Sequence, residues 1–144
     1  LAGYIESTPD RRLAPTSRFF ARALAESPVQ AGEPNPVEDG HSDALTIDDY
    51  LIERPSQTVL IRVKGDSMQD AGILEGDLVV VEKTASAKRG DVVVAIVDGQ
   101  FTLKRLDVDR GQFVLKPENR AYPVIRPEGT LEIFGVMVGL VRKL

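Results

Sequence analysis

The 144-residue chain contains no cysteine, no tryptophan and one histidine. Without cysteine there can be no disulfide scaffold, thiolate zinc site or cysteine nucleophile, and this composition is compatible with a cytoplasmic protein. Basic residues are not in excess, since 18 Lys and Arg face 22 Asp and Glu, so we expect no direct sequence-specific DNA binding. No apolar run approaches the roughly 20 residues of a membrane helix, and the N-terminal residues lack the pattern of a signal peptide.

Proline divides the chain into two parts. Five of the nine prolines fall within the first 36 residues. Because proline fixes φ and removes a backbone donor, such a segment does not form the interior of a sheet. We therefore predict an extended N-terminal arm over residues 1–43 and a folded domain over residues 44–144. Within the arm, residues 17–27 could form about two helical turns, which would be marginal alone.

The second part is rich in β-branched runs separated by glycine turns. The runs span residues 58–63, 77–83, 91–98, 100–108, 112–117 and 131–143. Asp98-Gly99 between two of them is a strong hairpin signal, and Gly135 and Gly139 in the last run suggest bulges. Thr46 could cap a short helical turn that ends near Ile52. This spacing predicts a mostly β fold with compact, strongly curved antiparallel sheets.

Most side chains capable of acid–base chemistry have an ordinary explanation. His41 lies in the polar stretch "EDGHSD", and a solvated loop histidine is favoured over a member of a catalytic triad. The acids Asp48, Asp49, Asp66 and Asp70 lack the spacing of metal ligands, and turn capping is favoured for them. We therefore expect neither a metal nor another cofactor.

Ser67 and Lys104 remain as a possible pair. Ser67 lies in "KGDSMQD", directly after a strand-like run and a glycine. Strand alternation places Lys104 on one face with Thr102, Leu106 and Val108. Burial on an aliphatic face lowers the pKa of a lysine, and a neutral amine could then deprotonate a serine. A strand lysine that reaches water is the more common outcome, so these residues alone leave the pairing open.

Longer stretches resemble a known family. "VKGDSMQDAGILEGDLVVVEK" and "GDVVVAIVDGQFTLKRL" are similar to the self-cleaving Ser-Lys peptidase domain of LexA-type SOS repressors and of UmuD, an accessory subunit of a mutagenic DNA polymerase. The stretches "KPENRAYPVI" and "EIFGVMVGLVRK" continue the match, and "PVQAGEPNPVEDG" resembles the cleavage segment. The resemblance covers roughly residues 17–144.

The resemblance assigns a role to each site residue. It implies that Ser67 is the nucleophile, that Lys104 is its general base, and that the backbone N–H groups of Asp66 and Ser67 are the oxyanion donors. It places the scissile bond between Ala31 and Gly32. The small side chain of Ala31 suits the family's P1 pocket, and Gly32 lets the backbone pass close to the nucleophile.

The resemblance also implies partners. These are a second copy of the chain in a homodimer, cleaved in cis or in trans; a RecA filament on single-stranded DNA, which stimulates cleavage; and the catalytic subunit of a Y-family translesion polymerase, which binds the product of residues 32–144. The UmuD type is favoured because only 31 proline-broken residues precede the cut site, too few for the DNA-binding domain of a LexA-type repressor.

Two other functions stay open. The chain could be the C-terminal portion of a LexA-type transcriptional repressor, or a non-cleaving binding module of the same fold. A type I signal peptidase shares the Ser-Lys chemistry, but the missing membrane segment counts against it.

Overall fold

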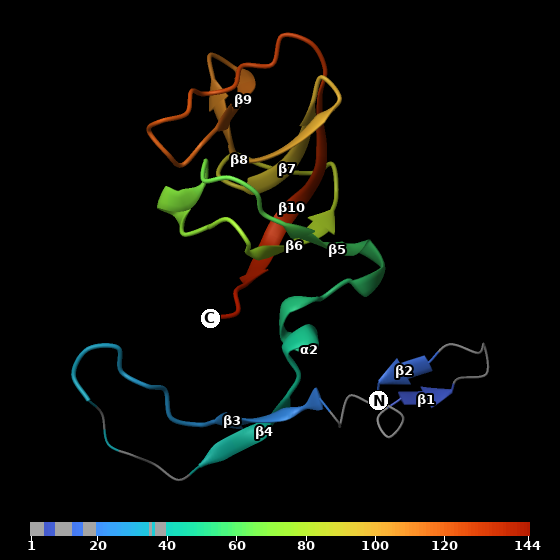
Figure 1. Ribbon diagram of the computed structural model, residues 1–144, viewed down its shortest axis with the longest axis vertical. Coiled ribbons are helices and arrows are strands. Elements are labelled where there is room, and N and C mark those ends of the chain that lie inside the picture. Colours follow the sequence, from blue (N-terminus) through green and yellow to red (C-terminus); the bar gives the residue numbers. More distant parts are fainter. Residues whose placement is uncertain (1–4, 8–12, 16–19, 35, 37–39) are drawn as a thin grey trace. The chain divides into compact units, whose positions relative to one another are not determined.

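The computed structural model describes residues 5–7, 13–15, 20–34, 36 and 40–144. The chain forms two compact units, Leu1–Glu53 and Arg54–Leu144 (Figure 1). Among the described residues, no helix has the length and apolar character needed to cross a membrane.

The described residues of the first unit include two short strand pairs and the helix α2 (Ile47–Leu51). Strand β1 (Ile5–Ser7) pairs antiparallel with β2 (Leu13–Pro15), and β3 (Arg22–Ala25) pairs antiparallel with β4 (His41–Leu45). The predicted extended arm therefore contains two strand pairs, which the proline content did not predict. Proline is tolerated here because the pairs are only two-stranded, and Pro15 stands at the end of its strand.

The predicted helical turns over residues 17–27 are wrong for Arg22–Ala25, which form β3, while residues 17–19 lie outside the described ones. A helix of that length is marginal alone because its nucleation is costly, and Arg22–Ala25 instead form their backbone hydrogen bonds with β4. The helix predicted after Thr46 is confirmed as α2 (Ile47–Leu51), with C-cap Ile52. The Thr46 hydroxyl accepts a hydrogen bond from the Asp49 N–H at 3.1 Å.

The second unit is built on one antiparallel sheet of six strands, in the order β5-β6-β10-β7-β8-β9. The strands are β5 (Thr58–Arg62), β6 (Leu78–Lys83), β7 (Val92–Val97), β8 (Gln100–Asp109), β9 (Gln112–Lys116) and β10 (Leu131–Val141). Each corresponds to one of the β-branched runs, so the predicted mostly β, antiparallel fold is confirmed. The Asp98-Gly99 hairpin is also confirmed, since Val97 pairs with Gln100 and both turn residues have positive φ.

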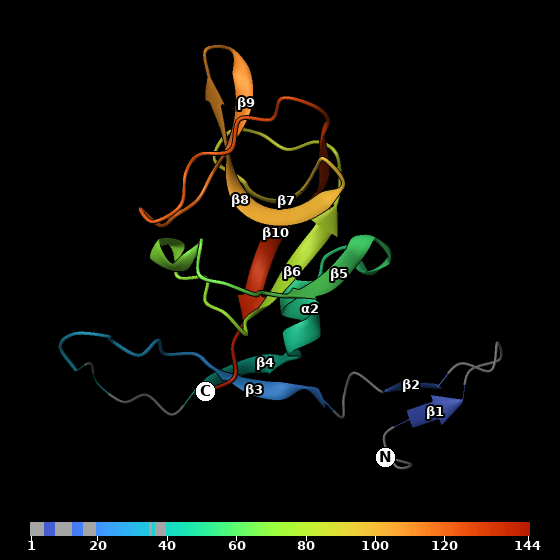
Figure 2. The same ribbon diagram turned by 45° about the horizontal axis from the view of Figure 1, so that its top comes forward.

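Strand β10 runs through the middle of the sheet and pairs with both β6 and β7 (Figure 1). Its register shifts at Gly135 against β7 and at Gly139 against β6, as the two glycines suggested. A Cβ atom on Gly135 would come within 2.6 Å of the Glu82 carbonyl oxygen, so the strands approach too closely there for a side chain. These shifts and the bend of β8, visible in Figure 2, give the sheet its curvature.

Two clusters of buried side chains form the core of this unit. One contains Met68, Ile73, Val79, Val81 and Val94. The other contains Val93, Ala95, Leu106 and Leu115, from β7, β8 and β9. Met68 and Ile73 come from the loop that carries Ser67, so the first cluster fixes that loop against the sheet.

Candidate active site

The loop between β5 and β6 holds Ser67 in a defined position. It is closed at its base by hydrogen bonds from the Val63 N–H to the Asp77 carbonyl and from the Gly76 N–H to the Val63 carbonyl. Met68, the next residue after Ser67, is only 2% exposed. Because its neighbour is anchored in the core, the Ser67 backbone cannot move far from the sheet.

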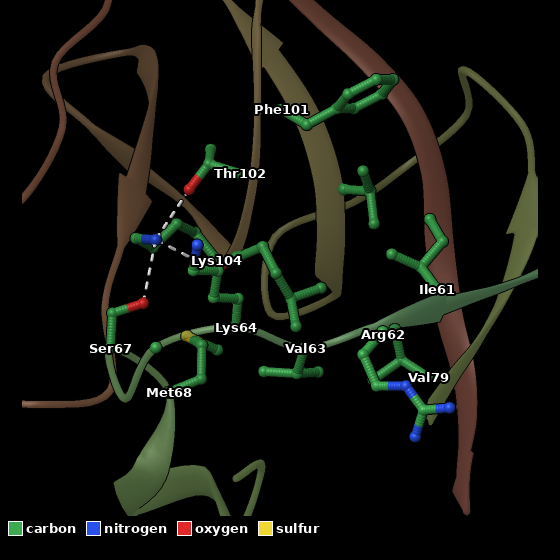
Figure 3. Close-up of a pocket in the computed structure, with 13 residues that line it drawn as sticks. Ile61, Arg62, Val63, Lys64, Ser67, Met68, Val79, Phe101, Thr102 and Lys104 are labelled. Atoms are coloured by element: carbon green, nitrogen blue, oxygen red, sulfur yellow. Dashed lines mark hydrogen bonds between the residues drawn. The ribbon is translucent and has the colours of Figure 1, made fainter. Parts of the chain in front are cut away.

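Lys104 approaches Ser67 from strand β8. Its Nζ lies 3.0 Å from Ser67 Oγ, although the residues are 37 positions apart (Figure 3). Lys104 is only 9% exposed, and Leu106 on the same face is fully buried. The face predicted from strand alternation is therefore confirmed, and this lysine is largely buried.

Two further oxygens surround the Lys104 amine. Nζ lies 2.7 Å from Thr102 Oγ1 and 3.1 Å from the Leu103 carbonyl oxygen. A neutral amine has two N–H donors and one lone pair. If the two N–H groups are donated to Thr102 and Leu103, the lone pair is left for the hydroxyl proton of Ser67. Strand alternation had placed Thr102 beside Lys104, but its part in the site was missed.

No ion pair among the described residues involves Lys104. The carboxylate of Asp66 accepts a hydrogen bond from Tyr122 Oη at 2.5 Å, and Glu118 pairs with Arg105 at 2.6 Å. The amine therefore has no carboxylate partner to stabilise its charge. Burial lowers the pKa of Lys104 below its ordinary value, which favours the neutral, basic form.

Two backbone donors lie free beside the Ser67 side chain. Within the described part of the chain, neither the Asp66 N–H nor the Ser67 N–H donates to another group, whereas the carbonyls of both residues accept hydrogen bonds. Free N–H groups next to a nucleophile can stabilise the negative oxygen of a tetrahedral intermediate.

A cavity of about 240 Å³ opens beside Ser67 and Lys104 (Figure 3). Its apolar wall includes Ile61, Val63, Val79 and Phe101. Phe101 is 66% exposed and packs edge-on against Phe134, with ring centroids 5.4 Å apart. Strands β5 and β8 contribute to opposite sides of the cavity, which suits an extended peptide segment.

The predicted cleavage segment belongs to the first unit. Ala31 and Gly32 are exposed, and Val29 just before them is 92% exposed. A Cβ atom at Gly32 would meet nothing within 4 Å. Both residues of the predicted scissile bond are therefore exposed within the unit that carries them.

The remaining candidates lie apart from this chemistry. His41 begins β4 and is not part of a loop, which corrects its predicted setting. His41 pairs with Ala25 of β3, and the polar sequence around His41 did not predict this strand pairing. Asp48 and Asp49 lie in the first turn of α2. Among the described residues, no group of three or more potential ligands could hold a metal ion.

Comparison with known proteins gives a consistent set of relatives. Residues 23–138 match the family model described as Peptidase S24-like. Protein SamA of Salmonella typhimurium is 42% identical over 113 residues, which cover 78% of this chain and 79% of that protein. The LexA repressor of Opitutus terrae is 45% identical over 116 residues, but the match spans only 58% of its length. LexA repressor 2 of Pseudomonas putida is 40% identical over an alignment of 152 positions, which covers 99% of this chain and 74% of that repressor.

Proposed function

Because the chain belongs to the Peptidase S24-like family, we propose that it is a self-cleaving serine peptidase that cuts its own Ala31–Gly32 bond. One observation carries the proposal: Ser67 Oγ lies 3.0 Å from the amine of Lys104, which is buried and has no carboxylate partner within the described residues. This is the arrangement in which a lysine can act as a general base.

The reaction begins with the arm in the cavity as an added strand. Neutral Lys104 takes the hydroxyl proton as Ser67 Oγ attacks the Ala31 carbonyl carbon. The N–H groups of Asp66 and Ser67 then stabilise the oxyanion.

Collapse of the tetrahedral intermediate breaks the peptide bond. The Lys104 ammonium passes its proton to the leaving Gly32 nitrogen, and residues 1–31 remain bound to Ser67 as an ester. Lys104 next deprotonates a water molecule, which hydrolyses the ester and regenerates the Ser67 hydroxyl. The products are a new carboxylate at Ala31 and a new amino terminus at Gly32. Because the substrate is tethered, a high effective concentration compensates for a modest active site.

The wider role that we propose is in SOS mutagenesis, and it depends on the resemblance to UmuD. The RecA filament favours the arm position in which cleavage occurs, which is a shift in population and not new chemistry. The shortened chain, residues 32–144, forms a homodimer that joins the catalytic subunit of a Y-family translesion polymerase in the bacterial cytoplasm.

Product masses from three proteins test the chemistry. The wild type, Ser67→Ala and Lys104→Ala are incubated with activated RecA filament, and separately at pH 10 without it. From the wild type we expect two fragments, one that ends at Ala31 and one that begins at Gly32. We expect no fragments from either variant. The same fragments from Ser67→Ala would refute the mechanism, and an intact wild-type chain under both conditions would favour the non-cleaving binding module.

A repressor role is the second candidate, favoured by a specific observation. The match to the Pseudomonas putida LexA repressor 2 extends over nearly the whole chain, including the region of the β1–β2 pair. Operator-specific DNA binding by the natural full-length protein would favour this role, whereas retention of a translesion polymerase subunit would favour the first.

A further inference from the structure

A segment far from Ser67 in sequence holds the backbone on both sides of the nucleophile. The Glu118 N–H donates to the Ser67 carbonyl at 2.8 Å, and the Asp70 N–H donates to the Glu118 carbonyl at 2.8 Å. The next residue, Asn119, donates from Nδ2 to the Asp66 carbonyl at 2.9 Å, a shorter contact than the 3.2 Å hydrogen bond that the same carbonyl accepts from the Gln69 N–H. Two adjacent residues thus hold two successive carbonyl groups of the nucleophile loop.

The contact from Asn119 has a direct geometric consequence. In a trans peptide, the carbonyl of one residue and the N–H of the next lie in one plane and point in opposite directions. A hydrogen bond that fixes the Asp66 carbonyl therefore also fixes the direction of the Ser67 N–H. This N–H donates to no other group of the described chain, and it is one of the two oxyanion donors in the proposed reaction.

The Asn119 side chain is itself held in one orientation. Its Oδ1 accepts a hydrogen bond from the Ala121 N–H at 2.9 Å, so its amide nitrogen must face the Asp66 carbonyl. The side chain of Asp66 is held by Tyr122 from the same segment. The Glu118 side chain pairs with Arg105, the neighbour of Lys104, so one segment contacts the surroundings of both proposed catalytic residues.

We propose that Asn119 is a positioning residue that aims the Ser67 N–H at the oxyanion of the self-cleavage reaction. The inference rests on the proposed function. Asn119 touches neither the scissile bond nor Lys104, and it acts only through the Asp66–Ser67 peptide. Removing its donor should lower the rate of bond breakage without changing the protonation of the base.

Two substitutions separate this role from a merely structural one. Asn119→Asp loses the Nδ2 donor but keeps an oxygen that can accept from the Ala121 N–H, whereas Asn119→Ala loses both contacts. Gln112→Glu is the matched control, because it makes the same amide-to-acid change at an exposed position in β9. The rate of cleavage of the intact chain is measured by mass over a pH series that spans the titration of Lys104, together with each melting temperature.

Removing an oxyanion donor outright lowers kcat about 10²- to 10³-fold, so we expect misdirection of one donor to lower the plateau rate by roughly 10- to 100-fold. Both Asn119 variants should show this fall, while Gln112→Glu matches the wild type. In Asn119→Ala, which adds no charge, the pH of half-maximal rate should stay unchanged. If Asn119→Asp unfolds at the assay temperature, the rates of both variants and the wild type are compared at a lower temperature at which all three remain folded.

Other outcomes would overturn the inference. A wild-type rate in Asn119→Asp with a loss only in Asn119→Ala would assign Asn119 to the local turn. A displaced half-maximal pH in Asn119→Ala would mean that Asn119 acts through Lys104. The Ser67→Ala variant separates this inference from the proposed function. If the wild type cleaves and Ser67→Ala does not, either of the two outcomes above rejects only the role of Asn119. Cleavage by Ser67→Ala rejects the proposed function itself.

Discussion

Thr102 Oγ1 lies 2.7 Å from the Nζ atom of Lys104, two residues along the same face of β8. This is the shortest of the three polar contacts of the amine, and the Thr102 hydroxyl sets the direction of one N–H group. The lone pair of a neutral Lys104 is thereby directed toward Ser67.

Removing the hydroxyl at position 102 tests this orientation. In Thr102→Val the amine loses one acceptor, so we expect the plateau rate of self-cleavage to fall about 10-fold. Because the hydroxyl also stabilises the ammonium, its loss lowers the pKa of Lys104 further, and the rate should reach half its maximum at a lower pH than in the wild type. Thr102→Ser keeps the hydroxyl and should stay close to the wild-type rate and profile. Equal rates in Thr102→Val and Thr102→Ser would contradict the orienting role.

The buried amine should reduce stability as well as provide catalysis. Lys104→Met fills the same space without desolvating a charge, so we expect no cleavage but a higher melting temperature at pH 7. Each kcal/mol gained raises Tm by about 2–4 °C in a chain of roughly this size. Ser67→Ala also prevents cleavage but leaves the lysine buried, so its Tm should remain near the wild-type value. A lower Tm in Lys104→Met would show that the hydrogen bonds of the amine outweigh its burial.

Arg142 and Asp77 should support the folded state of the second unit. Asp77 is 2% exposed, and both its carboxylate oxygens contact the Arg142 guanidinium, at 2.7 and 2.8 Å. Arg142 also donates to the Gly72 carbonyl in the nucleophile loop at 2.8 Å. We expect Arg142→Gln to lower Tm clearly more than Arg54→Gln, which breaks an exposed pair with Glu82. Equal losses in the two variants would contradict a special role for Arg142.

Acid should remove the same stabilisation. The hydrogen bonds from Arg142 and from the Leu74 N–H lower the pKa of Asp77 to about 2. An unfolded Asp has a pKa of about 3.9, so the contribution is complete above that pH and is lost as the pH falls toward 2. Urea unfolding of the wild type and Asp77→Asn should therefore differ most above about pH 4, and the difference should shrink below it. A difference that stays constant down to pH 2 would contradict this.

The strands and turns of the second unit were predictable because their signals are local. The Asp98-Gly99 pair predicts a hairpin wherever it lies between two strand-like runs, since both residues accept positive φ. Strand β3 was not predictable from Arg22–Ala25, because its pairing with β4 depends on residues far along the chain. Local propensity favoured helical turns at these residues, but the pairing with β4 makes them a strand.

The candidate site divides in the same way. Alternation along β8 was enough to place Lys104 on the inner face, but it could not show which residue would lie opposite. The contact with Ser67 depends on how the loop after β5 folds against the sheet. The role of Asn119 had no local signal at all, because its partner Asp66 is 53 residues away.

Direct titration of Lys104 tests the central claim most sharply. In Ser67→Ala, which cannot cleave itself in the proposed mechanism, the Cε resonance of labelled Lys104 is followed by NMR as a function of pH, with Lys104→Ala used to assign it. We expect the amine to lose its proton well below the ordinary lysine pKa of about 10.4, near the pH at which wild-type self-cleavage reaches half its maximal rate. An amine that titrates at or above about 10.4 would contradict a neutral Lys104 as the base that activates Ser67.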